Sequence, residues 1–84
     1  MSNASGQKPA ATEIHDNYQT LIDYVGGTNP VYLGKAAPGV ATTATSWSIK
    51  KITYDVNNNP TTVKPADGTD TFDKVWDDRT TYSY

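Results

Sequence analysis

The sequence predicts a mainly β fold: a small antiparallel sheet or hairpin module, preceded by a flexible N-terminal arm and one short N-terminal helix. Several strong helix formers are scarce, since the chain holds two Leu, one Glu and one Arg. Thr, Val and Ile together contribute 23 of the 84 residues, and six Tyr and two Trp join them. These residue types suit a pleated, half-buried surface. Turn dipeptides such as Asn29-Pro30 and Pro38-Gly39 divide the chain into short segments.

The first two predicted segments are the arm, residues 1–12, and a helix over residues 13–25; residues 26–84 form the predicted β domain. The arm is small, polar and without periodicity. Apolar residues of Glu13–Val25 recur at i, i+4, i+7, i+8 and i+11, which is one stripe of a helix. Thr12 is a suitable N-cap and Gly26-Gly27 a suitable end. The stripe should pack on a partner or on the sheet, and its residues are Ile14, Tyr18, Leu21, Ile22 and Val25.

The central part of the β domain reads as strands and turns. A short strand is expected over Val31–Lys35, followed by a loop over Ala36–Ala44. Ser46–Val56 is the strongest strand. It should form a hairpin with Thr61–Pro65, because the asparagines and proline of Asn57–Pro60 favour a turn.

The alternation within the strongest strand changes phase. Trp47 and Ile49 share one parity, whereas Ile52, Tyr54 and Val56 share the other. Either a bulge at Lys50-Lys51 returns all the apolar residues to one face, or both faces of the strand are partly covered.

The C-terminal part contains a turn and two aromatic segments. Ala66–Gly68 is the turn. Phe72, Val75 and Trp76 recur at i, i+3 and i+4, which predicts one helical turn or tight loop. Thr80–Tyr84 is expected to be a final short strand.

Composition excludes several classes of protein. The chain has no cysteine, so neither a disulfide framework nor a thiolate zinc site supports its core. No apolar run approaches the roughly 20 residues of a membrane helix, and the first residues lack the apolar region of a signal peptide. A net charge of −2, with six Lys and one Arg, does not favour nucleic acid. Leu, Ile, Val and Phe number only 13 of 84, so we expect oligomerisation or docking to complete the fold.

The polar residues do not assemble into a catalytic motif. Asp67, Asp70 and Asp73 are spaced as in a loop that could bind a hard cation, but the alternating ligands and terminal Glu of an EF-hand are missing. Aspartate is also an ordinary turn residue. The single histidine, His15, has no nucleophile and acid arranged around it. We therefore assign no catalytic residue, no metal and no cofactor.

The aromatic residues allow two interpretations. Trp47, Tyr54, Phe72 and Trp76 form either the core or a flat platform that stacks on sugars. Tyr82 and Tyr84 are expected at a subunit boundary. Arg79, the only arginine, follows Asp77 and Asp78, and an ion pair of Asp78 and Arg79 could set register across the sheet or across an interface.

The order of the motifs in the second half is similar to that of small virion structural proteins of tailed bacteriophages. Those motifs are Trp47–Asp55 (WSIKKITYD), Ala66–Gly68 (ADG), Phe72–Arg79 (FDKVWDDR) and the tyrosine-rich end. The resemblance covers about Val31–Tyr84 and brings no catalytic residue with it. It implies a non-enzymatic structural part of the particle, found in the virion and made in the host cytoplasm. It leaves open whether that part is capsid decoration, neck, tail or fibre.

Residues and resemblance together lead to one expected function and one alternative. We expect a homo-oligomeric component that docks on other virion structural proteins, with no nucleic-acid or membrane partner. On this interpretation, removal of Met1–Val25 abolishes incorporation into particles. The alternative is a carbohydrate-binding module at a fibre tip, which would use the tryptophans and terminal tyrosines. A third possibility, an accessory domain of an enzyme, has no specific sequence support.

Overall fold

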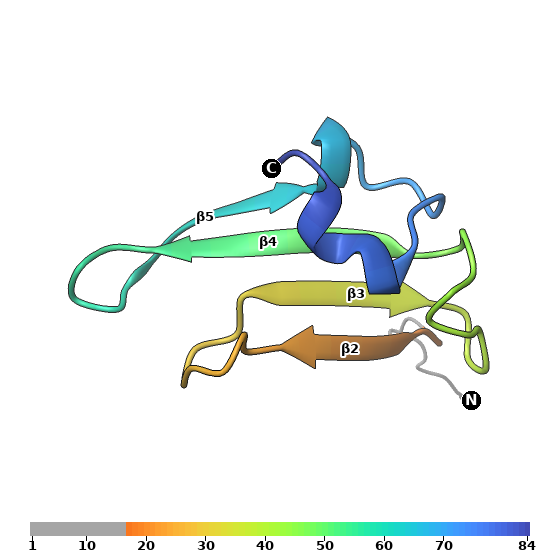
Figure 1. The fold of residues 1–84 in the computed structure, drawn as a ribbon, viewed down its shortest axis with the longest axis horizontal. Coiled ribbons are helices and arrows are strands. Elements are labelled where there is room, and N and C mark those ends of the chain that lie inside the picture. Colours follow the sequence, from red (N-terminus) through yellow and green to blue (C-terminus); the bar gives the residue numbers. More distant parts are fainter. Residues whose placement is uncertain (1–16) are drawn as a thin grey trace, which may run out of the picture.

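The computed structural model of the protein describes residues 17–84, which form one four-stranded antiparallel sheet (Figure 1). Neighbouring strands in the sheet are also neighbours in the chain, so the sheet is a meander of hairpins. Two short 3₁₀ helices follow it. No helix within this range has the length and apolar character needed to cross a membrane. The mainly β prediction is confirmed, with the elements β2 (Gln19–Asp23), β3 (Tyr32–Ala36), β4 (Ser48–Tyr54), β5 (Pro60–Pro65), η1 (Ala66–Gly68) and η2 (Trp76–Thr81).

The predicted helix is wrong where the structure describes it, because Gln19–Asp23 is strand β2. Leu21 lies opposite Gly34 of β3, and Ile22 lies opposite Leu33. The burial of its side chains alternates with the period of a strand. Pairing with β3 supplies backbone hydrogen bonds, and these outweigh the local helix propensity of the segment. The expected helix end at Gly26-Gly27 is instead the β2–β3 turn, where Gly26 has a φ of 75°. The arm and Glu13–Asp16 lie outside the described residues.

The two faces of β4 explain its change of phase. There is no bulge at Lys50-Lys51: these residues lie opposite Leu33 and Tyr32 in regular register with β3. Trp47 and Ile49 point to one side of the sheet and are fully buried, whereas Ile52 and Tyr54 have the opposite parity and are half-buried. Both faces therefore carry apolar residues, which is the second of the two alternatives. The register shifts only further along, between Thr53 and Tyr54.

The β4–β5 hairpin has the predicted turn and returning strand. Asp55 Oδ1 accepts hydrogen bonds from the backbone N–H groups of Asn57 and Asn59, at 2.9 and 3.0 Å. Asn58 adopts a positive φ of 64°, a conformation that asparagine tolerates. The hydrogen bond from the Asn59 backbone is the main reason that the pKa of Asp55 lies below its ordinary value.

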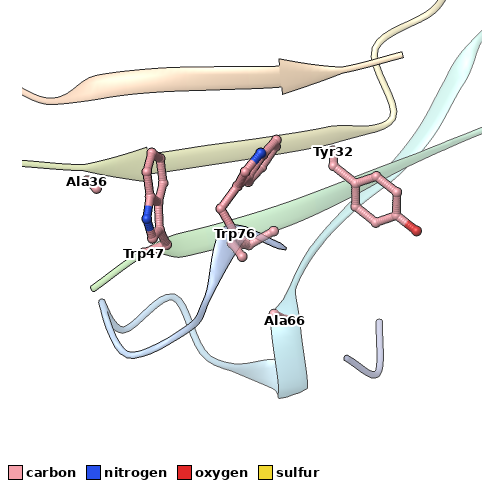
Figure 2. Packing of buried hydrophobic residues seen from close by; sticks show 6 residues of the cluster. Tyr32, Ala36, Trp47, Ala66 and Trp76 are labelled. Carbon is pink, nitrogen blue, oxygen red and sulfur yellow. The ribbon is translucent and has the colours of Figure 1, made fainter. Parts of the chain in front are cut away.

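One face of the sheet, here called the covered face, is packed beneath residues 66–84 (Figures 1 and 2). Trp47 and Lys74 exchange two backbone hydrogen bonds of 2.9 Å, which hold the C-terminal segment at the start of β4. This places the Trp76 ring 5.9 Å from that of Trp47. Trp47 Nε1 donates to the carbonyl of Ala41 at 2.9 Å, so its polar atom is satisfied. The buried core consists of Tyr32, Ala36, Trp47, Ile49, Ala66 and Trp76.

Gly34 makes the approach of Trp76 possible. A Cβ atom added to Gly34 would lie 2.6 Å from Trp76 Cζ3 and 3.2 Å from Trp47 Cε3. Real Cβ atoms do not approach carbon so closely, and both rings are packed. The six-membered ring of Trp76 therefore occupies the space that a side chain would fill at position 34.

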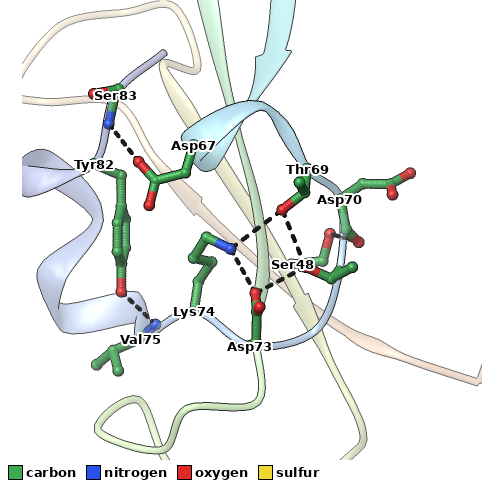
Figure 3. Close-up of polar contacts among 10 residues, drawn as sticks. Ser48, Asp67, Thr69, Asp70, Asp73, Lys74, Val75, Tyr82 and Ser83 are labelled. Carbon is green, nitrogen blue, oxygen red and sulfur yellow. Dashed lines mark hydrogen bonds and ion pairs between the residues drawn. The ribbon is translucent and has the colours of Figure 1, made fainter.

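The predicted final strand, Thr80–Tyr84, is wrong. Residues up to Thr81 belong to η2, and the last three residues form a tail that folds back on the covered face. The tail is attached at both backbone and side chain (Figure 3): Asp67 N donates to Ser83 O at 2.7 Å, and Ser83 N donates to Asp67 Oδ1 at 3.0 Å. The hydroxyl of Tyr82 accepts from the backbone of Val75 at 2.8 Å. The chain loses strand pairing here but satisfies its polar groups through these contacts.

Tyr84 lies against Tyr32, with ring centroids 5.7 Å apart. Its hydroxyl donates to the carbonyl of Arg79 at 2.7 Å. Burial raises the pKa of Tyr84 to about 12, because the phenolate would lose solvation in this position.

Arg79 connects η2 to the other end of the described chain. Its Nε atom lies 2.8 Å from Asp23 Oδ2 in β2, and both side chains are about three-quarters buried. The guanidinium carbon also lies 4.7 Å from the centre of the Trp76 ring, and Nη1 donates to the Trp76 carbonyl at 3.1 Å. Asp23 Oδ1 accepts from Val25 N at 2.9 Å. One ion pair thus fixes the C-terminal segment across the sheet.

Acid should weaken the fold through Asp23. Its pKa lies below the ordinary value of 3.8, because the Val25 N–H and then the Arg79 guanidinium stabilise the carboxylate. A carboxyl group whose pKa is lowered by folding stabilises the fold above its unfolded-state pKa, and that stabilisation is lost as pH falls through the lowered value. We expect the melting temperature to be nearly constant above about pH 5 and to fall below about pH 4.

Thermal unfolding of Asp23→Asn between about pH 3 and pH 7 tests this expectation. The variant should melt at a lower temperature than wild type at neutral pH and should lose less on acidification. Asp78→Asn, the same change at an exposed position of η2, is the control and should keep the wild-type pH dependence. Equal acid dependence in Asp23→Asn and wild type would contradict a role for this carboxylate.

Candidate functional site: the open sheet face

The second face of the sheet, here called the open face, is the candidate functional surface. Alternation along each strand and the strand register place its side chains in rows: Ile22, Leu33, Lys50 and Pro65 lie side by side across all four strands. The C-terminal segment packs on the opposite side (Figure 1). The open face consists of Thr20, Ile22, Leu33, Lys35, Ser48, Lys50, Ile52, Val63 and Pro65.

Large apolar side chains of the open face remain in contact with water. Ile22 is 50% exposed and Val63 is 55% exposed. Leu33 and Ile52, between them in the sheet, are half-buried. Single exposed apolar residues are common on proteins, but a group of them on one face of a sheet is typical of an interaction site.

An aromatic pair borders the open face at the start of β2. The rings of Tyr18 and Phe72 are stacked with centroids 5.1 Å apart, and each residue is 44% exposed. Ser48 Oγ donates to the carbonyl of Asp70 at 2.9 Å, and this bond draws the loop that carries Phe72 against β4. Lys35 Nζ lies 5.9 Å from the centre of the Tyr18 ring.

Beside this pair the open face has a shallow hollow of about 140 Å³, lined by Thr20, Leu33, Lys35, Ser48 and Lys50. Two of these lining residues, Lys35 and Lys50, are lysines. None of the open-face side chains is acidic. The surface therefore suits an apolar partner that also carries negative charge.

The residues of the predicted helical stripe are separated in the sheet. Leu21 packs against the core on the covered face, whereas Ile22 belongs to the open face and Tyr18 borders it. Val25 lies in the β2–β3 turn, where it is 60% exposed with a φ of 51°. Ile14 lies outside the described residues.

The aromatic candidates divide between the core and the surface. Trp47 is 0% exposed and Trp76 is 7% exposed, so neither presents a ring face to a sugar in this conformation. Tyr54 is half-buried and its hydroxyl donates to the Pro30 carbonyl. Phe72 is at the border of the open face.

The candidates for a subunit boundary lie mostly within the chain's own fold. Arg79 pairs with Asp23 rather than with Asp78, which is exposed in η2. Tyr82 and Tyr84 pack against the core and are half-buried.

The acidic cluster makes local contacts. Asp67 binds the tail, and Asp73 Oδ1 lies 2.5 Å from Lys74 Nζ and accepts from Thr71 Oγ1 at 2.9 Å (Figure 3). The Lys74 contact is the main reason that the pKa of Asp73 is lowered. Within residues 17–84, the aspartate side chains do not gather into a group of three or more that could hold a metal ion. These contacts stabilise the loop that carries the aspartates.

Sequence reasoning missed most of the open face. Thr20, Leu33, Lys35, Lys50 and Val63 were not expected at a site. The second phase of alternation in β4 is the signal that could have indicated it, because Ile52 and Tyr54 require an apolar surface opposite the core.

Comparisons with protein-family models, with curated proteins and with solved structures found no match to this chain. The role of the chain is therefore inferred from its sequence and its geometry alone.

Proposed function

We propose that this chain is a non-enzymatic structural component of a tailed-phage virion, which assembles with itself and docks on other virion proteins. The observation that carries the docking role is the open face. It presents Ile22 and Val63, each about half exposed, on the side of the sheet opposite the core. The virion setting is supported by the resemblance of Val31–Tyr84 to small phage structural proteins.

The partner at the open face is a different protein whose surface is apolar with acidic residues. Two copies of this chain stacked through their open faces would bring Lys35 and Lys50 of both copies close together, and like charges in an interface are unfavourable. Apolar area provides most of the gain on docking, at about 25 cal/mol per Å² removed from water. The two lysines then select a partner with carboxylates near the hollow.

A pair of valine variants tests this docking surface. Val63→Glu places a carboxylate on the open face in its end strand β5, whereas Val56→Glu makes the same change in the β4–β5 turn, where Val56 is 97% exposed. We expect Val63→Glu to reduce the amount of this chain in purified particles at least about tenfold, which is a loss of about 1.4 kcal/mol of binding. Val56→Glu should be incorporated like wild type. Quantitative mass spectrometry of particles from complemented infections measures both.

Two results would count against the proposal, each against a different part. Absence of the wild-type chain from purified particles would overturn the virion role. Equal incorporation of the two valine variants would overturn the open face as the docking surface. Deletion of Met1–Val25 is a poor test, because it removes β2 from the sheet together with the arm.

The carbohydrate-binding alternative can be tested in parallel by measuring glycan binding. With Trp47 and Trp76 in the core, a sugar would have to use the exposed Tyr18 and Phe72 rings. Glycan binding that disappears in Phe72→Ala, with the fold intact by circular dichroism, would favour the module over the structural component.

A further inference from the structure

Strand β2 is an end strand of the sheet within residues 17–84, so one side of its backbone faces away from β3. The other end strand, β5, begins with Pro60 and ends with Pro65, and neither residue can donate a backbone hydrogen bond. β2 contains no proline. Proline is one of the ways in which proteins prevent a further strand from adding to a sheet edge. The edge formed by β2 lacks this protection.

Exposed apolar side chains also concentrate at this edge. The described residues contain seven large hydrophobic side chains that remain exposed, and four of them belong to β2 or its immediate flanks. These four are Tyr18, Ile22, Tyr24 and Val25. The only charged residue of β2, Asp23, is bound to Arg79 and does not oppose the approach of another strand.

We propose that β2 pairs with β2 of a second copy of this chain, antiparallel and centred on Leu21, so that two four-stranded sheets become one. In this register Thr20 of each copy lies opposite Ile22 of the other, and Leu21 lies opposite itself. Paired residues then have the same parity, which places both open faces on the same side of the joined sheet.

A second copy of the chain fits this edge because the pairing is self-complementary. Tyr18 lies opposite Tyr24 of the other copy, and aromatic and β-branched pairs across strands are favourable. Gln19 lies opposite Asp23, so like charges do not meet there, and the Gln19 amide stays bonded to the Ala37 and Val40 carbonyls of its own copy. Backbone hydrogen bonds between the two strands supply binding energy without a large core.

This pairing specifies the self-assembly in the proposed function and rests on it, but it is separate from docking at the open face. The edge forms the dimer in solution, whereas the open face receives another virion protein in the particle. Each can therefore fail without the other.

Two double variants of the full chain test the pairing. In Thr20→Glu/Ile22→Glu, each new carboxylate lies opposite a carboxylate of the other copy. In Thr20→Glu/Ile22→Lys, which changes the same positions, each new carboxylate lies opposite an ammonium group of the other copy. Within one copy, position 20 lies beside Lys35 and position 22 beside Leu33 in both variants, and circular dichroism checks that both fold. We expect sedimentation equilibrium of wild type to show a mass that rises from 9.1 kDa to twice that value with concentration.

The Glu/Glu variant should dimerise at least about tenfold more weakly than the Glu/Lys variant. A wild-type chain that keeps the single-chain mass at every concentration would overturn the proposal. So would equal dimerisation of the two variants, because an interface elsewhere would not distinguish them.

The absence of cysteine allows a direct test of register. A Thr20→Cys chain mixed with an Ile22→Cys chain should form disulfide-linked mixed dimers in excess over linked dimers of either chain alone. Self-pairs at position 20 or at position 22 would be two residues out of register, beyond the roughly 7 Å between Cα atoms that a disulfide spans. Equal yields of mixed and self-linked dimers would overturn pairing centred on Leu21.

Discussion

Replacement of Trp76 by alanine should leave most of the protein molecules unfolded. Trp76 is 7% exposed, lies against Trp47 and Gly34, and receives the Arg79 guanidinium on its ring. Removal of a buried tryptophan side chain costs about 3–5 kcal/mol. Small domains have total stabilities near the lower end of about 5–15 kcal/mol, so little would remain. Far-UV circular dichroism during urea unfolding measures the loss without depending on tryptophan fluorescence.

Phe72→Ala is the matched control. Phe72 is also an aromatic residue of the C-terminal segment, but it is 44% exposed and stacks only at the border of the open face. We expect a loss of no more than about 1 kcal/mol. A similar loss in both variants would contradict the assignment of Trp76 to the core.

Gly34→Ala should be the most damaging substitution by a single methyl group. The new Cβ would lie 2.6 Å from Trp76 Cζ3, so the two tryptophan rings or the strand must move. Overpacking of this kind costs about 1–3 kcal/mol. Gly27→Ala makes the same change in the β2–β3 turn, where the nearest atom would be the Tyr24 carbonyl oxygen at 3.4 Å, and should be nearly neutral.

A double variant identifies the source of the damage. Trp76→Leu by itself destabilises the protein, but the smaller side chain also leaves space beside position 34. If the clash with Trp76 is the cause, Gly34→Ala combined with Trp76→Leu should lose less stability than the sum of the two single variants, by about 0.5–3 kcal/mol. Additive losses, measured by urea unfolding, would contradict the proposed contact.

The sequence was sufficient for the β4–β5 hairpin and insufficient for β2. The asparagines before Pro60 encode the turn locally, and Asp55 supports it with its own side chain. In contrast, residues 18–25 fit both a helical stripe and a strand, since Leu21 and Ile22 are adjacent apolar residues. The choice between the two depends on β3, which supplies the partner strand.

The open face could be predicted only in part. The sequence gives alternation within β4, but which of its two faces becomes core depends on where residues 66–84 pack. The Arg79–Asp23 pair joins residues 56 positions apart, and nothing local distinguishes Asp23 from the other seven aspartates. Tyr18 and Ile22 were identified as interface residues on the basis of a helix, although Ile22 belongs to strand β2 and Tyr18 directly precedes it.

The cover supplied by residues 66–84 has a consequence for biosynthesis. The hairpins of the sheet form from neighbouring segments, but the core remains open until Trp76 and the tail are available to pack on it. Contacts between distant parts of a chain slow folding, and they cannot form before both parts have left the ribosome. We therefore expect this domain to complete its fold only after residues 66–84 have left the ribosome, with a period in which both sheet faces are exposed to other proteins in the cell.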